Sequence, residues 1–282
     1  MRSSVSIGLL VYLLLDGWRL SLPAPTPAPG EVPIRLLTYN IRSGGGGVEN
    51  LAGAIRRASP DAICLQEASP YFHLPDPMPG LQKLLPEWRF TSYGDLAVGV
   101  RGGQIEGLEI VRYPVPGSYR AALLVRTTLK GQPLTLVTTH LATAFHGETI
   151  GSQRRSLPRY LESTARARHV QLDALLARTR SVTGSLIVCG DFNTPPRGVE
   201  YARLTERFTD AFAAVGNGFG WSYSAVHPLL RIDYVWCGEK VRPVEAKILD
   251  WPHSDHKPLL ADLAITPFDR GLGKPTAQRA PG

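Results

Sequence analysis

The sequence predicts an α/β fold, and three observations support this prediction. Between residues 32 and 266, β-rich segments are separated by Gly and Pro turns. Several of these segments are almost continuously apolar, which is typical of strands buried on both faces because helices cover each side of their sheet. Two other segments repeat apolar residues at helical spacing. We therefore expect sheets whose outer faces are covered by helices.

Five apolar runs are the expected strands, and each carries a polar residue at its end, just past it or within it. In chain order they read IRLLTYN, AICLQE, LTLVTTH, SLIVCGDFN and RIDYVW, at residues 34–40, 62–67, 134–140, 185–193 and 231–236. Side chains at strand ends are held rigidly, and polar groups there cost little desolvation if they face a shared cleft. The runs therefore predict a polar cleft as well as the sheets.

Two segments have the apolar spacing of helices. Residues 49–59 place Leu51, Ala54 and Ile55 on one face, and Pro60 ends this helix. Residues 159–180 carry an apolar stripe opposite many arginines. Such an arginine face is usually a solvated helix surface, but it is also suited to guiding a polyanion.

Composition excludes several classes of protein. The chain has 282 residues, a net charge of +7 and 43% apolar residues, which excludes a disordered tail, a collagen, a coiled coil and a polytopic membrane protein. The basic balance favours a polyanionic or phosphorylated partner without selecting one. Cys64, Cys189 and Cys237 each lie in an apolar run, so we expect core thiols rather than disulfides or a zinc site.

The two ends of the chain differ from the body. Arg2 precedes an apolar stretch at residues 5–15, so residues 1–22 are typical of a secretory signal or a membrane anchor. A Pro/Ala-rich linker follows at residues 23–31, then one domain at 32–266 and a flexible tail at 267–282. We expect an exported or membrane-anchored protein, with cleavage open, or a cytoplasmic one if the start codon is mis-assigned.

The polar residues of the strand ends form one chemical set. Taken singly, each of these residues has a purely structural explanation, as a turn cap, a surface carboxylate or a core histidine with its hydrogen bonds satisfied. Taken together, oxygen ligands dominate and no cysteine is close, which suits Mg²⁺ or Mn²⁺ rather than zinc. A cation that neutralises phosphate oxygens beside a carboxylate-oriented histidine supports phosphoester hydrolysis. The set comprises Asn40, Glu67, His140, Asp191, Asn193, Asp233, Asp255 and His256.

Six motifs connect this set to a known family. TYNIR, LQE, TTHL, GDFNTPP, RIDYVW and SDHKPL occur in this order between residues 34 and 265. Their order and spacing closely resemble the motif series of the endonuclease/exonuclease/phosphatase superfamily, the DNase I-like fold. The resemblance implies an α/β (α+β) four-layer sandwich of two mixed β-sheets packed face to face with helices outside. It also implies a divalent-metal site at one end of the sandwich.

The resemblance implies the metal ligands. Glu67 of LQE matches the principal metal carboxylate, Asn40 of TYN lies beside it, and Asp255 of SDH closes the site. The expected cofactor is Mg²⁺, with Mn²⁺ as a substitute. Position 42 is Arg rather than an acid, which argues against a second metal there and suits Arg42 to meeting phosphate.

The resemblance also implies catalytic roles. His256 matches the histidine beside the scissile phosphate, acting as base or as phosphate ligand, and Asp233 would orient it. Asp191 and Asn193 would position the attacking water and the phosphate. The sequence leaves open which of Asp191 and His256 takes the proton. His140 would stabilise the developing negative charge or protonate the leaving oxygen.

Substrate contacts are expected at two places. Asn40 of TYN and Arg120 of SYRAALLV match positions where the family binds substrate phosphate. Residues 142–158 follow TTHL and are expected to border the cleft, so substrate choice is expected to reside there.

Three functions remain in competition. The first is a metal-dependent phosphoesterase that acts as a nuclease, favoured by the basic balance and the arginines of residues 154–180. The second is a phosphatase or phosphodiesterase of a lipid-linked or small organic phosphate at the membrane, favoured by the N-terminal apolar segment. The third is a catalytically silent binding protein, whose expected mark, a missing acid or histidine, is not seen. A monomer is expected.

Overall fold

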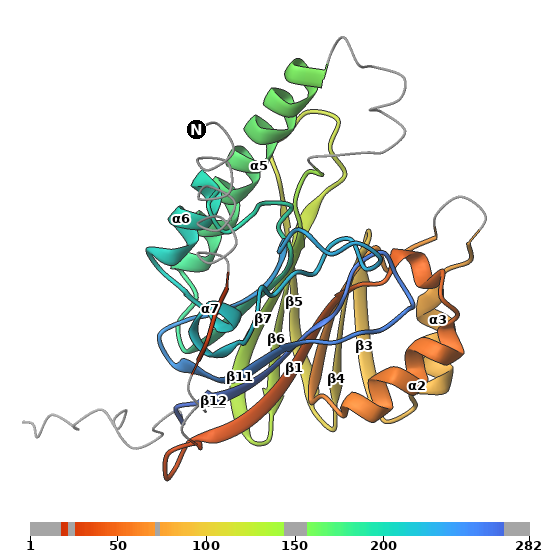
Figure 1. Cartoon of the computed structure of the whole chain (residues 1–282). Coiled ribbons are helices and arrows are strands. Elements are labelled where there is room, and N and C mark those ends of the chain that lie inside the picture. The colour runs from red at the N-terminus through yellow and green to blue at the C-terminus, as the bar shows by residue number, and fades with distance from the viewer. Residues whose placement is uncertain (1–17, 22–25, 71–73, 144–156, 268–282) are drawn as a thin grey trace, which may run out of the picture.

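Two six-stranded β-sheets pack face to face, with helices on both outer sides (Figure 1). The structure is a computed structural model that describes residues 18–21, 26–70, 74–143 and 157–267. The first sheet has the strand order β11-β12-β1-β2-β4-β3. Its strands are β1 (Val32–Asn40), β2 (Ala62–Gln66), β3 (Trp88–Tyr93), β4 (Leu96–Arg101), β11 (Val241–Ile248) and β12 (Leu259–Ile265).

The second sheet has the strand order β5-β6-β7-β8-β10-β9. Both sheets are mixed, because β1 pairs in parallel with β2 and β7 with β8, while the other neighbours are antiparallel. The strands are β5 (Gln104–Arg112), β6 (Ala121–Leu129), β7 (Gln132–His140), β8 (Ser185–Asp191), β9 (Thr209–Asp210) and β10 (Asp233–Cys237).

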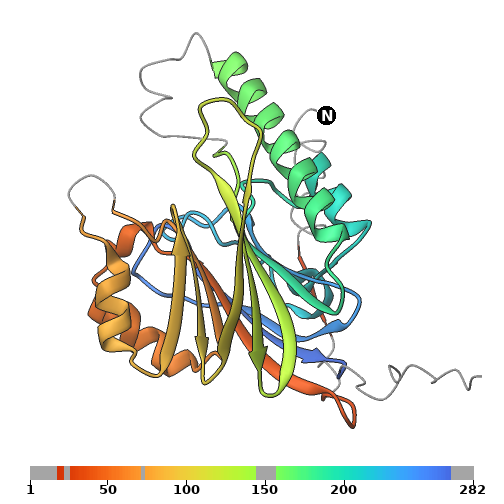
Figure 2. The same cartoon turned by 180° about the vertical axis from the view of Figure 1, so that it is seen from behind.

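Helices form the two outer layers, as the view from behind also shows (Figure 2). On the first sheet, Leu51 and Ile55 of α2 pack against the buried strand residue Ile63. On the second sheet, Leu172 of α5 packs against Val137. The helices are α2 (Val48–Ala58), α3 (Pro77–Leu84), α5 (Leu157–Arg180), α6 (Val199–Thr205) and the short α7 (Ala211–Val215), with a 3-10 turn η1 at Arg42–Gly44. The predicted four-layer sandwich is confirmed.

The inner core explains why the predicted strands are apolar on both faces. Leu36 and Val98 of the first sheet belong to one buried cluster with Leu136 and Val235 of the second. All three cysteines are free and buried, as predicted. One polar contact crosses the core, where the Gln66 amide donates to the Thr138 hydroxyl at 2.9 Å. Both predicted helices form within two residues of the expected starts, at Val48 and Leu157.

Gly190 allows a close approach between the parallel strands β7 and β8. Its φ is +134°, and a Cβ built there would lie 2.0 Å from the carbonyl oxygen of Thr139 on β7. No other residue fits such a position without moving the backbone. The glycine of the GDFN motif therefore fixes the separation of β7 and β8 one residue before Asp191.

A buried ion pair anchors the segment that leads into β10. Arg231 Nη1 lies 2.5 Å from Asp210 Oδ2, with both side chains almost inaccessible, and the guanidinium carbon lies 4.8 Å from the centre of the Tyr234 ring. We expect Arg231→Ala to lower the free energy of unfolding by about 3–5 kcal/mol, because it leaves the Asp210 charge buried and unpaired. Urea unfolding measures this change.

A matched control is Arg242→Ala, which breaks a pair with Glu31 at the surface. This variant should cost less than about 1 kcal/mol. Equal losses in the two variants would contradict the assignment of the buried pair.

The structure describes only part of the two ends of the chain. Residues 1–17, 22–25 and 268–282 lie outside the described residues, so the predicted boundaries of anchor, linker, domain and tail stay predictions. Among the helices that the structure describes, none combines the length and the apolar character needed to cross a membrane.

Candidate active site

The predicted strand-end residues meet at one end of the sandwich. Asn40 ends β1, His140 ends β7, Asp191 ends β8 and Asp233 begins β10. In the register of the second sheet, Asp191 pairs with both His140 and Asp233. β1 rises toward this end of the molecule in Figure 1. Parallel β1/β2 and β7/β8 pairs therefore bring residues far apart in sequence into one place.

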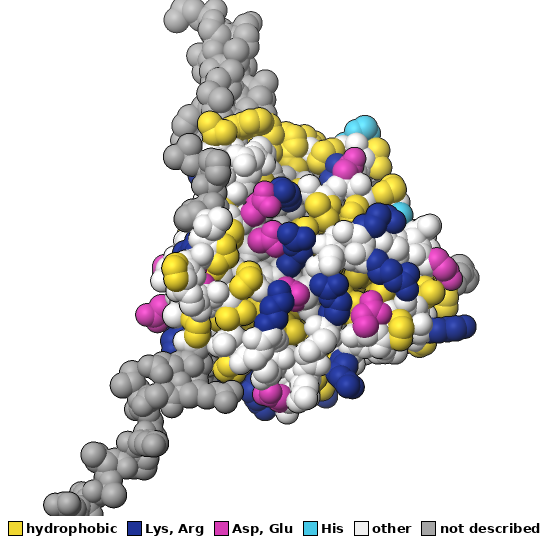
Figure 3. Space-filling view, turned by 90° about the horizontal axis from the view of Figure 1, so that it is seen from below, with side chains coloured by type: hydrophobic (Ala, Val, Ile, Leu, Met, Phe, Trp, Pro, Cys, Tyr) yellow, Lys and Arg dark blue, Asp and Glu magenta, His cyan; other side chains and the backbone are white. Residues whose placement is uncertain are grey.

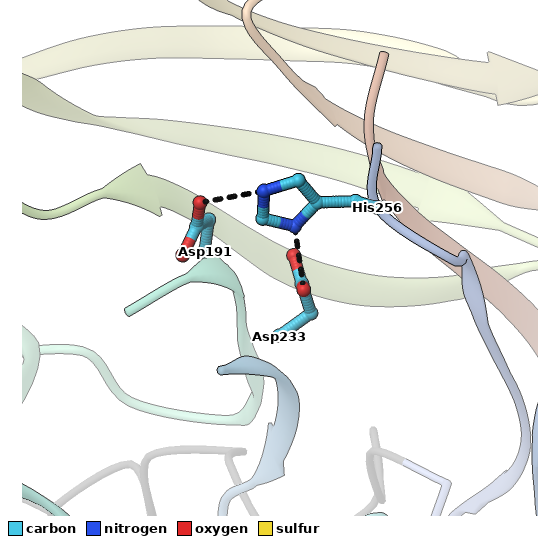
Figure 4. A group of neighbouring side chains, drawn as sticks. All are labelled: Asp191, Asp233 and His256. Atoms are coloured by element: carbon cyan, nitrogen blue, oxygen red, sulfur yellow. Dashed lines mark hydrogen bonds and ion pairs between the residues drawn. The ribbon is translucent and has the colours of Figure 1, made fainter. Parts of the chain in front are cut away.

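His256 lies between two carboxylates (Figure 4). Its Nδ1 is 2.9 Å from Asp233 Oδ2, and its Nε2 is 3.7 Å from Asp191 Oδ2. The two aspartates are 1% exposed and the histidine 5%. A neutral ring would direct one acceptor nitrogen at an anion, so this position favours the imidazolium. Burial alone would lower the pKa of His256, but Asp233 and Asp191 outweigh it and raise that pKa to about 10.

Asp191 is the point at which the other groups converge. Its Oδ2 lies 3.3 Å from Asn40 Nδ2 and 3.4 Å from His140 Nε2, and its Oδ1 accepts the backbone N–H of Asn193 at 2.9 Å. Burial and the neighbouring charge of Asp233 raise the pKa of Asp191, while His256, His140 and the Asn193 amide counteract them. The result is a carboxylate that accepts a proton more readily than an exposed aspartate.

A second carboxylate–histidine pair holds His140. Its Nδ1 lies 2.8 Å from Oδ2 of Asp95, in the turn between β3 and β4. Burial raises the pKa of Asp95, but the hydrogen bond from His140 and the charges of His140 and Arg120 outweigh it, so the net pKa is lowered. Arg120 donates to the His140 carbonyl at 3.2 Å and to the Thr143 hydroxyl at 3.0 Å. Arg120 thus fixes the backbone at His140, and its contact with phosphate stays a prediction.

Asn40 joins the first sheet to the second. Its amide nitrogen donates to Glu67 Oε1 at 3.0 Å and also faces Asp191. Its carbonyl oxygen accepts the backbone N–H of Arg42 at 3.2 Å. Because the amide bridges two carboxylates, Asn40 keeps Glu67 next to the buried cluster although Glu67 is partly exposed. The predicted neighbourhood of Asn40 and Glu67 is thus present.

Three residues of the site have left-handed backbone. The φ angles are +46° at Arg42, +51° at Glu67 and +49° at Asn193. Each costs of the order of 1 kcal/mol for a residue with a Cβ, and such strain gathers at functional sites. Asn193 is held in this conformation by its side-chain amide, which donates to the Leu141 carbonyl at 3.2 Å. The turns after β1, β2 and β8 are therefore shaped to present side chains.

Asp255 reaches the site on the loop between β11 and β12. Its backbone carbonyl accepts the N–H of Ala225 at 2.6 Å, and Oδ1 accepts the Ser254 hydroxyl at 3.2 Å. The loop can come this close because Gly46 has no side chain, since a Cβ there would lie 2.4 Å from His253 Cα. The predicted residues thus converge, although Asp255 is only partly buried.

Two residues of the site, Asp95 and Tyr223, belong to none of the sequence motifs. The only sequence signal at Asp95 is a Gly-Asp turn before an apolar run. Nothing in that run indicates that Asp95 contacts a histidine. Tyr223 lies with its ring centre 4.8 Å from that of His256. Burial raises the pKa of Tyr223, and the charges of Asp255, Asp191 and Glu67 raise it further. An isolated tyrosine carries no motif from which this contact could have been inferred.

Asp95 is expected to act as a positioning residue. We expect Asp95→Asn to lower kcat about 10- to 100-fold with KM nearly unchanged, because His140 loses the anion that fixes its ring and its tautomer. Since the pKa of Asp95 is lowered on folding, its contribution to stability is present above the unfolded pKa and is lost as pH falls through the folded pKa. The variant should therefore be less stable than the parent at neutral pH and approach it in acid.

The matched control for this variant is Asp61→Asn. Asp61 pairs with Lys130 at 2.7 Å at the opposite end of the sheets. It should lose stability without losing kcat. Steady-state kinetics and thermal unfolding across pH measure both variants, and equal kcat values for Asp95→Asn and the parent would contradict the positioning role.

Comparison with known proteins agrees with this geometry. No curated protein matches the chain. Among solved structures, an endonuclease/exonuclease/phosphatase from Bacteroides vulgatus has a TM-score of 0.66 at 17% identity, over 83% of this chain and 99% of that one. TDP2 from D. rerio, solved with a single strand DNA product, has 0.63 at 17% identity, over 82% and 98%. A mannosyl-6-phosphatase from Bacteroides thetaiotaomicron has 0.63 at 14%, over 82% and 99%.

At these identities the solved structures show the shared fold alone. The sequence comparison goes further, because the model of the Endonuclease/Exonuclease/phosphatase family matches residues 37–256, from β1 through His256. The matched segment contains every residue of the cluster described above. The chain therefore belongs to the Endonuclease/Exonuclease/phosphatase family, whose members are generally phosphoester hydrolases.

Proposed function

We propose that this protein is a divalent-metal-dependent phosphoesterase that hydrolyses phosphodiester bonds. The observation that supports this most is the convergence of Asn40, His140 and His256 on the Asp191 carboxylate, within 3.3–3.7 Å. A carboxylate that two histidines and an amide surround is equipped to orient water against phosphorus and to receive its proton. The family match gives the same reaction class.

The donor set fits a hard divalent cation. Glu67, Asp255 and the Asn40 carbonyl would hold Mg²⁺ or Mn²⁺, because these ions prefer carboxylate and amide oxygens. Four carboxylates, Glu67, Asp191, Asp233 and Asp255, stand against the single imidazolium of His256, which leaves an excess of negative charge that a cation offsets. When bound, the ion would neutralise the non-bridging oxygens of the phosphate.

The buried side chains are suited to different roles in binding phosphate and in transferring the proton. Asp233 holds His256 at Nδ1, while Nε2 lies 3.7 Å from Asp191, beyond hydrogen-bond distance, so the Nε2–H is suited to donate to a phosphate oxygen. Asp191, whose pKa is raised, is then the acceptor for the proton of the attacking water. His140 directs Nε2 toward the same place while Asp95 holds Nδ1, so it is suited to stabilise charge on the leaving oxygen.

The nuclease prediction has less support from the described surface than from the sequence. Arg178 of α5 pairs with Glu109, and Arg166 with Glu162, each at 2.6 Å. Arg168 is turned inward and donates to the Ala142 carbonyl. Arg154 and Arg155 lie outside the described residues. The net charge of +7 favours nucleic acid, whereas the exposed apolar side chains of Val226, Leu229 and Leu230 on a loop beside the site favour a lipid-linked phosphate.

Three substrates test the proposal. The purified full chain should hydrolyse bis(p-nitrophenyl) phosphate in Mg²⁺, and its action on plasmid DNA and on phosphatidylglycerol vesicles ranks the two substrate classes. Turnover of none of the three in Mg²⁺ or Mn²⁺ would favour the silent binding protein and overturn the proposal. Light scattering on the same sample tests the expected monomer.

A further inference from the structure

Beside the active site, one loop exposes a cluster of apolar side chains. We call residues 224–230 the mouth loop. Val226 is 79% exposed, Leu229 69% and Leu230 37%. Single exposed apolar residues are ordinary, but three within five residues on one loop form a patch that water disfavours. A partner that covers this patch is therefore expected.

The base of the mouth loop is part of the active site. Tyr223 N and Leu230 O are 2.9 Å apart, and Tyr223 also bridges to His256. Ala225 N donates to the carbonyl of Asp255 at 2.6 Å. These bonds hold the loop against Asp255 and His256 of the candidate active site. Whatever covers the apolar tip is consequently brought to the catalytic groups.

A second exposed apolar element enters the body close by. Trp18 is 50% exposed and Leu20 83%. Between them, Arg19 exchanges two backbone hydrogen bonds with Gly218, both of 2.8 Å. The Trp18 ring packs edge-on against Phe219 at 5.1 Å. These contacts fix residues 18–21 on the segment that leads into the mouth loop.

The sequence around Trp18 indicates what covers both elements. The apolar stretch at residues 5–15 ends just before Trp18. Phe219 and Val226 are seven residues apart, so their Cα atoms lie within roughly 25 Å of each other even if the chain is fully extended. In the sequence, the apolar stretch thus directly precedes Trp18, whose ring packs on Phe219, seven residues before Val226 of the mouth loop.

The distribution of charge agrees with a membrane on this side. Arg42, exposed next to the site, forms no ion pair with the described residues, and the chain carries +7 overall. At the opposite end, seen in Figure 3, basic and acidic side chains are interspersed. There Arg35 pairs with Asp262, and Lys130 with Asp61, around a hollow of about 410 Å³. That end is suited to water, whereas the mouth loop exposes apolar side chains and the unpaired Arg42 lies on the same side, next to carboxylates that the proposed metal ion would offset.

We infer that Val226, Leu229 and Leu230, together with Trp18 and Leu20, dock onto an anionic lipid bilayer and turn the active site toward it. The substrate is then a lipid whose phosphate headgroup enters from the membrane plane. The docking surface stands on its own, while the substrate class rests on the proposed phosphoesterase function.

A fluorescent label on the mouth loop reports its insertion into a bilayer separately from any binding by the N-terminal segment. In the full chain, Val226→Cys is labelled with nitrobenzoxadiazole, while the three native cysteines are buried. Vesicles of equimolar phosphatidylcholine and phosphatidylglycerol should shift its emission to the blue. Leu108→Cys, 45% exposed midway along β5, is the matched control and should not shift. Vesicle-bound protein whose label at position 226 does not shift would overturn the inference.

A double variant tests the consequence for turnover. Val226→Glu with Leu229→Glu should lower hydrolysis of the vesicle lipid at least about tenfold, because two apolar insertions are replaced by charge. Hydrolysis of bis(p-nitrophenyl) phosphate in Mg²⁺ should stay unchanged. Equal lipid turnover by parent and variant, or a dimer that the variant abolishes in light scattering, would overturn membrane docking. Failure of both substrates with the parent would instead reject the phosphoesterase function and leave the emission shift intact.

Discussion

Replacing Asp191 with alanine is expected to lower kcat about 10³- to 10⁴-fold, or about 4–5.5 kcal/mol of transition-state stabilisation. Its Oδ2 is the atom toward which Asn40, His140 and His256 converge. Without the carboxylate, water has no acceptor for its proton, and the two histidines lose the anion that aligns their Nε2 atoms. Initial rates with bis(p-nitrophenyl) phosphate in saturating Mg²⁺ measure the loss.

The stability of the same variant separates chemistry from folding. The pKa of Asp191 is raised in the folded protein, chiefly by burial, so its ionised form destabilises the fold as pH rises through that interval. Asp191→Ala removes this penalty along with the hydrogen bond from Asn193. Its thermal midpoint at neutral pH, measured in the absence of divalent cations, should therefore equal or exceed that of the parent.

Asp173→Ala is the control, since Asp173 is exposed on α5 and pairs with His169 and Arg203, which lie outside the site. It should change neither kcat nor the midpoint appreciably. Asp191→Ala that kept more than about a tenth of the parental kcat would contradict the central role of this carboxylate.

The elements that could be predicted from the sequence are those whose signal lies within one short stretch of the chain. Strand ends such as Asn40 and Asp191 could be found because an apolar run that stops at a polar residue is a local pattern, and burial on both faces keeps the run apolar. The helix at α2 could be found because its apolar face repeats within one element. Once two parallel strand pairs are assumed, the meeting of these ends at one edge follows from strand direction alone.

The remaining parts of the site depend on contacts across the fold. Asp95 becomes a site residue only because the β3–β4 turn packs beside the end of β7, and no property of residues 94–96 encodes that neighbour. Tyr223 contacts His256 through a loop whose path is set by Gly216–Ala246 and Tyr223–His256 bridges. The Arg120 guanidinium donates to the His140 carbonyl and to the Thr143 hydroxyl, two contacts across the fold, and its expected contact with phosphate stays a prediction. Pairings of this kind are decided by tertiary packing, which a single sequence does not display.

Chelating divalent cations with EDTA is expected to abolish turnover, and Mg²⁺ or Mn²⁺ should restore it. In the proposed mechanism the phosphate binds beside the carboxylates of Glu67, Asp191, Asp233 and Asp255, and His256 offsets only one of their charges. Without a cation these carboxylates repel the phosphate, and the Arg120 guanidinium is already engaged by the His140 carbonyl and by Asp95. Full turnover in EDTA would remove metal catalysis from the mechanism.

Glu67→Gln then identifies the carboxylate that holds the ion. Glutamine keeps an oxygen that can accept the Asn40 amide, now 3.0 Å from Oε1, so the local structure should persist while one ligand charge is lost. The Mg²⁺ concentration for half-maximal activity should rise at least tenfold, about 1.4 kcal/mol, with kcat at saturation less affected. Glu109→Gln, which loses only a surface pair with Arg178, should leave the Mg²⁺ dependence unchanged. If the Mg²⁺ dependence of activity is unchanged in Glu67→Gln but shifts in Asp233→Asn, the ion binds elsewhere. The alternative site is the buried group of Asp191, Asp233 and His256, whose ligand atoms lie within 4.8 Å of one another.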